Sequence, residues 1–243
     1  MTKPQLIMMD TGGVNNADLE TTRTRLIQGN SWKQQKIIVI LPSADLISAK
    51  VALSHWNLQF PANQQVVKIL ALGQEVGESY SNALESVLAD PNLSKFDFVL
   101  TIEHDNILPY DAVIKLLKRM DEHPEMSAIQ GLYFLKNGPA QIWGSPENDC
   151  VINFRPQPPR ADGGIIETYG TAMGATLFRM DIFRDTRIKR PFFKTEPGCT
   201  QDLNFWMEIR KYGYRCCVDC DVRVGHYDFR GDFSNGLLPD FVW

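Results

Sequence analysis

Three consecutive polar residues, Glu103, His104 and Asp105, directly follow an apolar stretch at residues 96–102. Carboxylates at positions i and i+2 leave an extended segment on the same side, so those of Glu103 and Asp105 can act together. Two oxygens on one side can hold a hard divalent cation, whose other positions accept diphosphate oxygens and water. The segment therefore predicts a metal site, and the alternative is a polar turn before the next helix.

His226 and Asp202 are two further residues whose surroundings suggest chemistry. His226 follows a short apolar stretch and a glycine; a neutral imidazole there can complete a metal site and shifts its preference from magnesium toward manganese. Asp202 lies in the first turn of an expected helix, where it could serve as a general base facing a cleft. The alternatives are an ordinary surface or hydrogen-bonded histidine and an acid that complements the helix dipole.

A small-residue loop at residues 170–175 would let the backbone approach a ligand closely. It lacks the Gly-x-Gly-x-x-Gly spacing of a dinucleotide turn, and the chain has no Gly-Lys-Thr or Gly-Lys-Ser phosphate loop. Cys216, Cys217 and Cys220 suggest a metal knuckle, but a second ligand pair is missing, so we expect structural thiols on a strand.

Apolar periodicity predicts alternating strands and helices in the first half of the chain. The expected strands are residues 37–41, 66–72, 96–102 and 128–135, and the expected helices are residues 17–27, 43–56, 80–88 and 109–120. Parallel neighbours need crossover connections, so these units predict a mostly parallel sheet with helices on both faces and ligands at the carboxyl ends of its strands. The second half is loop-rich and partly antiparallel, with strands at 165–168, 175–179 and 215–218 and a helix at 200–212.

Composition excludes several classes of protein. The chain has 243 residues, 44% of them hydrophobic, and a formal charge of -4 without any long run of like charges, which argues against a nucleic-acid partner. The longest apolar runs are far below the roughly 18 residues of a membrane span, and a signal-peptide pattern is missing. Five cysteines, an odd number, argue against a disulfide scaffold. We therefore expect a soluble, cytoplasmic protein with no membrane span.

Taken in chain order, these segments resemble the GT-A fold glycosyltransferases, nucleotide-sugar-dependent enzymes of the family-two-like group. The resemblance covers residues 36–228. Residues 37–42 are similar to the first nucleotide-binding strand, residues 77–83 to the start of the second crossover helix, and residues 103–105 lie where the family has its Asp-x-Asp motif. Residues 170–178 are similar to the glycine-rich acceptor segment, Gln201-Asp202 to an acidic Glu-Asp pair, and Gly225-His226 to a late metal-binding histidine.

The resemblance implies a Rossmann-like α/β fold with a nucleotide-binding half at residues 36–135 and an acceptor-binding half at 136–228. Residues 1–35 would be an N-terminal extension, and residues 229–243 a tail without a regular period, whose Phe241 and Trp243 could pack against the body or a partner. The implied reaction moves a sugar from a nucleoside-diphosphate sugar, foremost a UDP-sugar, to the hydroxyl of a glycan, protein or small-molecule acceptor. Mn²⁺ or Mg²⁺ would assist by neutralising the diphosphate leaving group.

The same resemblance assigns roles to individual residues. Asp105 and His226 would bind the metal, and Glu103 would support the metal or bind the ribose; all of residues 103–105, His104 included, belong to the nucleotide-sugar site. Pro42, Ser43 and Gly73 would line the nucleobase pocket, with Asn82 near the ribose or diphosphate. Asp202 would be the base of an inverting reaction. The acceptor side would comprise Gly170, Thr171, Ala172 and Trp143, with Tyr133 and Tyr169 as further aromatic faces.

The sequence departs from the motifs of this family at two positions, and three alternative functions remain open. Glu103 replaces the first Asp of the motif and Gln201 replaces the usual Glu, which leaves the stereochemical outcome open. A sugar-phosphate nucleotidyltransferase would carry a Gly-rich turn with Thr-Arg-Leu after its first strand, whereas residues 24–26 precede it. A metal phosphohydrolase with a His-Asp pair is all-helical and needs more upstream histidines than His55. The third alternative is a non-catalytic sugar-binding module of the same fold.

Overall fold

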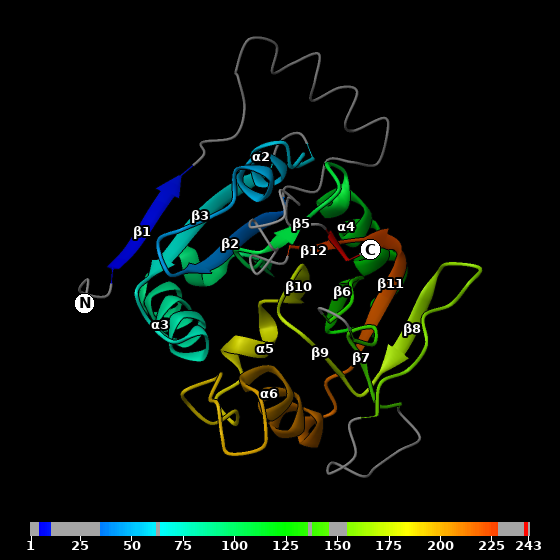
Figure 1. Cartoon of the computed structure of the whole chain (residues 1–243). Coiled ribbons are helices and arrows are strands. Elements are labelled where there is room, and N and C mark those ends of the chain that lie inside the picture. The colour runs from blue at the N-terminus through cyan, green and yellow to red at the C-terminus, as the bar shows by residue number, and fades with distance from the viewer. Residues whose placement is uncertain are drawn as a thin grey trace, which may run out of the picture.

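The computed structural model describes residues 5–10, 35–61, 64–135, 138–145, 155–227 and 241–242. Its centre is an eight-stranded mixed sheet with the strand order β1-β3-β2-β4-β10-β6-β11-β8 (Figure 1). The strands of this sheet are β1 (Gln5–Asp10), β2 (Lys36–Ser43), β3 (Gln65–Leu72), β4 (Phe98–Thr101), β6 (Ala128–Leu132), β8 (Ile165–Thr168), β10 (Thr176–Arg179) and β11 (Cys216–Arg223).

The directions of the strands divide the sheet as the sequence predicts. β3, β2 and β4 are parallel neighbours, and β6 is parallel to β11. β10 lies antiparallel between β4 and β6, and β1 and β8 are antiparallel at the two edges. The strand-helix units from β2 to β4 therefore pair in parallel, and the antiparallel strands are β10 and β8 from the second half of the chain and β1 from its N-terminal end.

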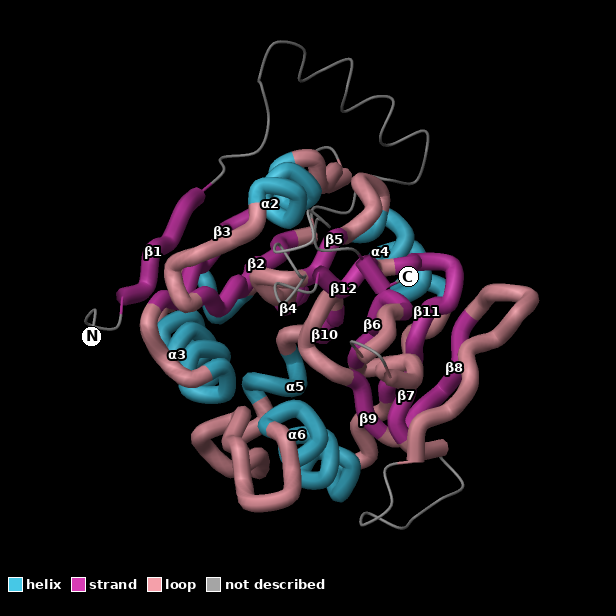
Figure 2. The backbone as a smooth tube through the Cα atoms, viewed as in Figure 1, coloured by secondary structure: helices cyan, strands magenta, loops and turns pink. Residues whose placement is uncertain are grey.

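Helices cover both faces of the sheet, which confirms the predicted α/β class (Figure 2). α2 (Ala49–Trp56) and α4 (Ala112–Glu122) pack on one face, and α3 (Val76–Ala89), α5 (Asp181–Arg184) and α6 (Gln201–Ile209) pack on the other. Alternation along β2 separates the two cores, because Ile38 and Ile40 join the α3 side while Ile37 and Val39 join the opposite side. None of the described helices is both long and apolar enough to cross a membrane.

Two small sheets lie beside the main one. β5 (Asn106–Ile107), β12 (Gly225–Tyr227) and β13 (Phe241–Val242) form a three-stranded sheet, and β7 (Ile142–Trp143) pairs with β9 (Gly170–Thr171). β13 lies in the predicted tail, so that tail contributes a strand. β1 lies in the predicted N-terminal extension and adds an edge strand to the main sheet. The predicted helix at residues 17–27 and Trp243 lie outside the described residues.

Strand β2 runs past Pro42, where the sequence suggested that it would stop. The carbonyl of Ile40 accepts a hydrogen bond from the backbone N–H of Ile102, so the even-numbered residues of β2 direct their backbone toward β4. β4 does not extend beyond Thr101. The backbone nitrogen of Pro42 therefore faces the side of β4 at a level where β4 has already ended. No hydrogen bond between strands is lost because proline lacks an N–H.

The helix predicted at residues 43–56 is wrong at its start and on its buried face. Ser43 is the last residue of β2, and α2 begins six residues later. Leu46, Leu53 and Trp56, expected on the buried face, are 80%, 59% and 85% exposed. Val51 is the buried residue of α2. This helix therefore rests on the sheet by a narrow contact.

Other boundaries differ by smaller amounts. The strands predicted at 96–102 and 128–135 shorten to β4 and β6, and the helix predicted at 200–212 becomes α6 followed by a 3-10 turn, Arg210–Tyr212. The strand predicted at 215–218 continues to Arg223, because the buried carboxylate of Asp219 is paired with Arg119 Nε of α4 at 3.0 Å. Cys216, Cys217 and Cys220 are buried on this strand, where burial raises the pKa of each thiol.

Candidate functional site

Asp105 lies in a turn at the carboxyl end of β4, between that strand and β5. This turn is closed by a hydrogen bond from Asn106 N to Glu103 O of 3.1 Å. β12 comes from the far end of the chain, pairs antiparallel with β5, and places His226 opposite Asn106. The fold therefore brings together two predicted site residues that are 121 positions apart.

The side chains of Asp105 and His226 are in contact. His226 Nε2 lies 3.2 Å from Asp105 Oδ2, and these side chains are only 12% and 13% exposed. His226 Nδ1 lies 2.8 Å from the carbonyl oxygen of Phe134. A carbonyl only accepts, so Nδ1 carries the hydrogen of this bond and the Nε2 lone pair of a neutral imidazole points at the carboxylate. A proton or a cation between the two groups is needed to make this contact favourable.

The arrangement fits a divalent metal ion in three respects. A metal-binding histidine commonly donates its other N–H to a backbone carbonyl, which is the role that Phe134 has here. Neighbouring ligands of an octahedral ion at about 2.1 Å lie about 3 Å apart, close to the separation of Asp105 and His226. A carboxylate and an imidazole suit Mn²⁺ as donors. Among the described residues, however, no three or more His, Cys, Asp and Glu side chains form a metal-binding group, so Glu103 stays a predicted ligand.

Several negative charges act on one region at this edge of the sheet. The buried hydroxyls of Tyr80 and Tyr133 have pKa values raised well above the usual one, first by burial and then by the charges of Glu103, Asp105 and Asp202. The three carboxylates come from the β4 turn and from α6, so the fold assembles an acidic region from distant segments. A diphosphate would be repelled from it unless a cation were bound.

The residues predicted for the nucleobase pocket lie side by side at the carboxyl ends of β2 and β3. The backbone N–H of Gly73 donates to the carbonyl of Ser43 at 3.2 Å, which joins the two strand ends. Gly73 has φ +74°, a conformation that favours glycine. Asn82, on α3, is exposed and donates from Nδ2 to Gln74 Oε1 at 3.0 Å, next to this turn. Pro42 and Ser43 therefore border the same edge as Asp105.

Asp202 is held in the first turn of α6, as the sequence predicts, with Thr200 at the N-cap position. Its Oδ1 accepts a hydrogen bond from Leu203 N at 2.8 Å. Burial raises the pKa of Asp202, and the hydrogen bonds from Thr200 and Leu203 lower it only in part. A raised pKa makes this carboxylate a stronger base, which suits proton abstraction from a hydroxyl.

A cavity of about 520 Å³ lies beside Asp202 and is lined in part by Trp143, Cys199, Thr200 and Leu203. Trp143 belongs to β7, and its indole Nε1 donates to Gln141 Oε1 at 2.6 Å, which fixes the ring. The predicted acceptor-side tryptophan thus borders a hollow at the start of α6, and Thr200 and Leu203, near Asp202 in the sequence, line the same hollow.

The segment Gly170–Ala172 is buried, and its hydrogen bonds connect it to α6 on one side and to β6 on the other. Trp206 Nε1 donates to Thr171 O and Oγ1, both at 3.0 Å, and Ala172 N donates to Gln130 Oε1 at 2.6 Å. A side chain at Gly170 would meet the Trp206 ring at 3.2 Å. The side chains of this segment therefore support the site from beneath, and their predicted contact with an acceptor remains a prediction.

Two neighbours of the metal-site turn were not singled out from the sequence. Asn106 is fully buried, and its side-chain Oδ1 and Nδ2 have no hydrogen-bond partner. His55 of α2 donates from Nε2 to the carbonyl of Asn106 at 2.9 Å. The position of Asn106 directly after Asp105 was the available signal, whereas His55 is 50 residues upstream and only the fold brings it here.

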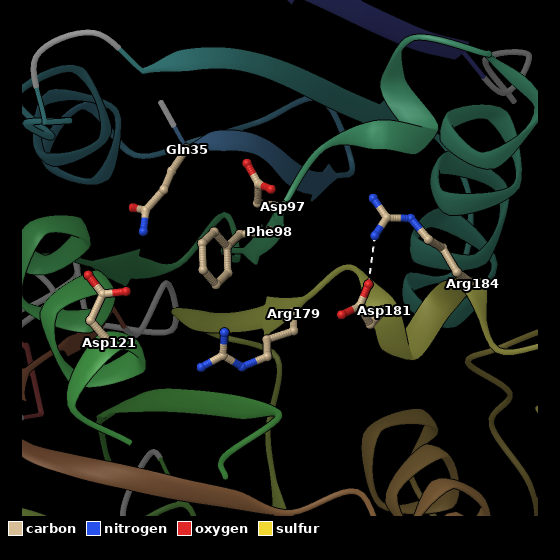
Figure 3. A pocket seen from close by; sticks show the side chains of 7 residues that line it. All are labelled: Gln35, Asp97, Phe98, Asp121, Arg179, Asp181 and Arg184. Atoms are coloured by element: carbon tan, nitrogen blue, oxygen red, sulfur yellow. Dashed lines mark hydrogen bonds and ion pairs between the residues drawn. The ribbon is translucent and has the colours of Figure 1, made fainter. Parts of the chain in front are cut away.

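A second polar cavity, of about 400 Å³, lies at the opposite edge of the sheet, at the amino ends of β2 and β4 (Figure 3). Its arginines are already engaged: Arg179 donates to the carbonyls of Met120 and Met126, and Arg184 pairs with Asp181 at 2.7 Å. These groups hold loops in place. The length of β4 separates this cavity from Asp105, so it takes no part in the site described above.

Comparisons with known proteins support the fold. No protein-family description and no curated protein sequence matches the chain. Among solved structures, A197 from STIV aligns with a TM-score of 0.56 and 14% identity over 80% of this chain and 86% of that one. GalNAc-T7, solved with UDP, GalNAc and Mn²⁺, aligns with a TM-score of 0.55 and 9% identity over 80% of this chain. The alignment spans less than half of GalNAc-T7, 44% of it. The chain thus has the GT-A-like glycosyltransferase fold that the sequence predicts.

Proposed function

We propose that this protein is a metal-dependent glycosyltransferase that moves a sugar from a nucleoside-diphosphate sugar, most favourably a UDP-sugar, to an acceptor hydroxyl. The observation that carries the proposal is the contact between Asp105 and His226 at the carboxyl end of β4, where a divalent cation would satisfy both groups, as a proton on His226 would in its absence. The GT-A-like fold supports it, since the neighbour GalNAc-T7 was solved with UDP and Mn²⁺.

On this proposal, the chain's own residues position the donor at the carboxyl edge of the sheet. Pro42, Ser43 and Gly73 border the nucleobase, and Asn82 lies toward the ribose and diphosphate. Asp105 and His226 would hold Mn²⁺ or Mg²⁺, with Glu103 in support. The bound cation would neutralise the negative charge that develops on the diphosphate as the sugar–phosphate bond breaks.

Asp202 has the role of general base if the reaction inverts the anomeric carbon. Its carboxylate is held rigidly by Leu203 N, and burial raises its pKa, so it can accept the proton of the acceptor hydroxyl as the new bond forms. The hollow lined by Trp143 would seat that acceptor, because an aromatic face suits the apolar face of a sugar. A retaining reaction would not need this base.

The proposal is tested by measuring nucleoside-diphosphate release from a panel of uridine, guanosine and thymidine diphosphate sugars, with Mn²⁺ and with a chelator. Water can replace the acceptor slowly, so release identifies the donor before the acceptor is known. We expect Mn²⁺-dependent release from one donor and a loss of about 10²-fold in Asp105→Asn.

The matched control is Asp181→Asn, which changes the same side chain at the opposite edge of the sheet and should leave release unchanged. Equal release by Asp105→Asn and the control would refute the metal site. Nucleotide-sugar binding without release, even with a broad set of acceptors, would favour the non-catalytic module instead.

A further inference from the structure

An apolar cavity of about 520 Å³ lies between α2 and the face of β2 and β3 on which α2 rests. Its volume is within the roughly 300–1,000 Å³ range of small-molecule sites. The sheet and the segment that follows α2 supply most of its wall. Apolar lining residues include Val39, Leu41, Leu58, Phe60 and Leu70.

The cavity exists because α2 packs poorly on the sheet. Val51 is the buried residue of this helix, and the Trp56 side chain, which lines the cavity, is 85% exposed. A well-packed helix of this length would bury a continuous stripe of side chains and leave no such space. The space is therefore open to a ligand from the side of Trp56.

One charged side chain lies in this apolar wall. Lys68 of β3 lines the cavity, and its Nζ is 5.6 Å from the centre of the Phe60 ring. Lys68 has no ion-pair partner among the described residues, and no described lining residue is a carboxylate. Lys68 is partly buried in this wall, and the loss of contact with water lowers its pKa. A ligand anion in the cavity would pair with this charge.

The other titratable residue of the wall does not compete for that anion. His55 lines the cavity from α2, and its Nε2–H is used by the carbonyl of Asn106. Burial lowers the pKa of His55 to about 4, so it is neutral at pH 7. Near neutral pH the cavity thus offers one cation and an extended apolar wall.

We propose that this cavity binds an aliphatic monocarboxylate, with its carboxylate on Lys68 and its hydrocarbon chain against the apolar face of β2 and β3. Such a ligand matches both the charge and the apolar lining of the cavity. The cavity lies on the face of the sheet, and its wall reaches the carboxyl edge at Ile102 and His55, next to the proposed nucleotide site. Binding of a monocarboxylate goes beyond the proposed glycosyl transfer and does not depend on it.

The test is calorimetric titration of the full chain with dodecanoate below its micelle concentration, and in parallel with dodecanol. We expect saturable one-to-one binding of dodecanoate. Lys68→Met keeps an unbranched side chain close to the length of the lysine stem and removes the charge, so it should weaken the affinity for dodecanoate at least about tenfold and leave the affinity for dodecanol unchanged.

A second pair of variants tests the location independently of Lys68. Ala52 lines the cavity, so Ala52→Phe should fill it and abolish binding of both compounds. Ala49 is also exposed on α2 but does not line the cavity, so Ala49→Phe should bind as the parent does. Thermal denaturation of each variant confirms that it is folded.

Three results would overturn the proposal. One is no saturable binding of dodecanoate by the parent protein. Another is equal affinity of Ala52→Phe and Ala49→Phe for dodecanoate. The third is one-for-one displacement of dodecanoate by UDP with Mn²⁺, which would identify the cavity as part of the nucleotide pocket.

Discussion

His55 should make the folded state markedly less stable as the pH falls from 7 to 5. Burial of this imidazole lowers its pKa from 6.5 to about 4, although its hydrogen bond to the carbonyl of Asn106 acts in the opposite direction. Between these two values the unfolded chain binds a proton that the folded chain does not. Stability therefore falls as the pH falls through this window.

The size of the effect follows from these two pKa values. Each tenfold change in proton affinity is worth about 1.4 kcal/mol, so the complete effect is about 3 kcal/mol. About 2 kcal/mol of this effect develops between pH 7 and pH 5. Over that range His55 of the unfolded chain takes up its proton, whereas His55 of the folded chain does so only near pH 4. An effect of this size is a large fraction of the usual stability of a domain, roughly 5–15 kcal/mol.

The assay is urea denaturation at pH 7 and at pH 5 of the parent protein and of His55→Gln. The glutamine amide can still donate to the carbonyl of Asn106 but does not titrate, and every other ionisable group is common to both proteins. We expect the parent to lose about 2 kcal/mol more than the variant over this range. Equal losses would show that His55 is not buried against β5, and the packing described for α2 would then be wrong.

Three further predictions concern other parts of the molecule. Arg119→Met should lower the free energy of unfolding by about 3 kcal/mol in urea denaturation, because the carboxylate of Asp219, 1% exposed, loses its cationic partner. Adding Asp219→Asn should restore most of the lost stability. If the double variant shows no recovery, the pairing is contradicted. Gly174→Ala should lower the free energy of unfolding by about 1–3 kcal/mol and weaken UDP binding, since a Cβ would lie 2.1 Å from Asn106 Oδ1 beside the metal-site turn. A Tm equal to that of the parent would refute this contact. Asp202→Asn should abolish transfer yet raise stability at pH 7, because a raised pKa means that the ionised carboxylate destabilises the folded state above its ordinary pKa. Reduced stability at pH 7 in urea denaturation would contradict that sign.

The sequence predicts the core strands and the residues that gather at their carboxyl ends. The apolar run that becomes β2 and the helical spacing that becomes α3 are strong local patterns, and the strand-helix alternation predicts parallel pairing. Asp105 and His226 are both predicted metal ligands, and the structure places them in contact, while their binding of a metal stays a prediction. The GT-A-like fold is confirmed by the structural comparisons.

The parts that the sequence predicts poorly depend on contacts between distant segments. Helical spacing placed Leu46 and Trp56 on a buried face, but α2 starts late and leaves both exposed. β11 continues through Asp219 because Arg119 of α4 compensates its charge, and no local pattern reports that partner. The unpartnered amide of Asn106 is likewise visible only once the fold is known.

The most direct test of the central claim is calorimetric titration of UDP, with and without Mn²⁺, into the parent protein, Asp105→Asn and His226→Gln. We expect the parent to bind UDP tightly only with Mn²⁺, and each variant to lose about 10–100-fold of that Mn²⁺-dependent affinity. Asp181→Asn, at the opposite edge of the sheet, should bind as the parent does. UDP affinity that does not change with Mn²⁺, or that both site variants retain in full, would contradict a metal-assisted nucleotide site at Asp105 and His226.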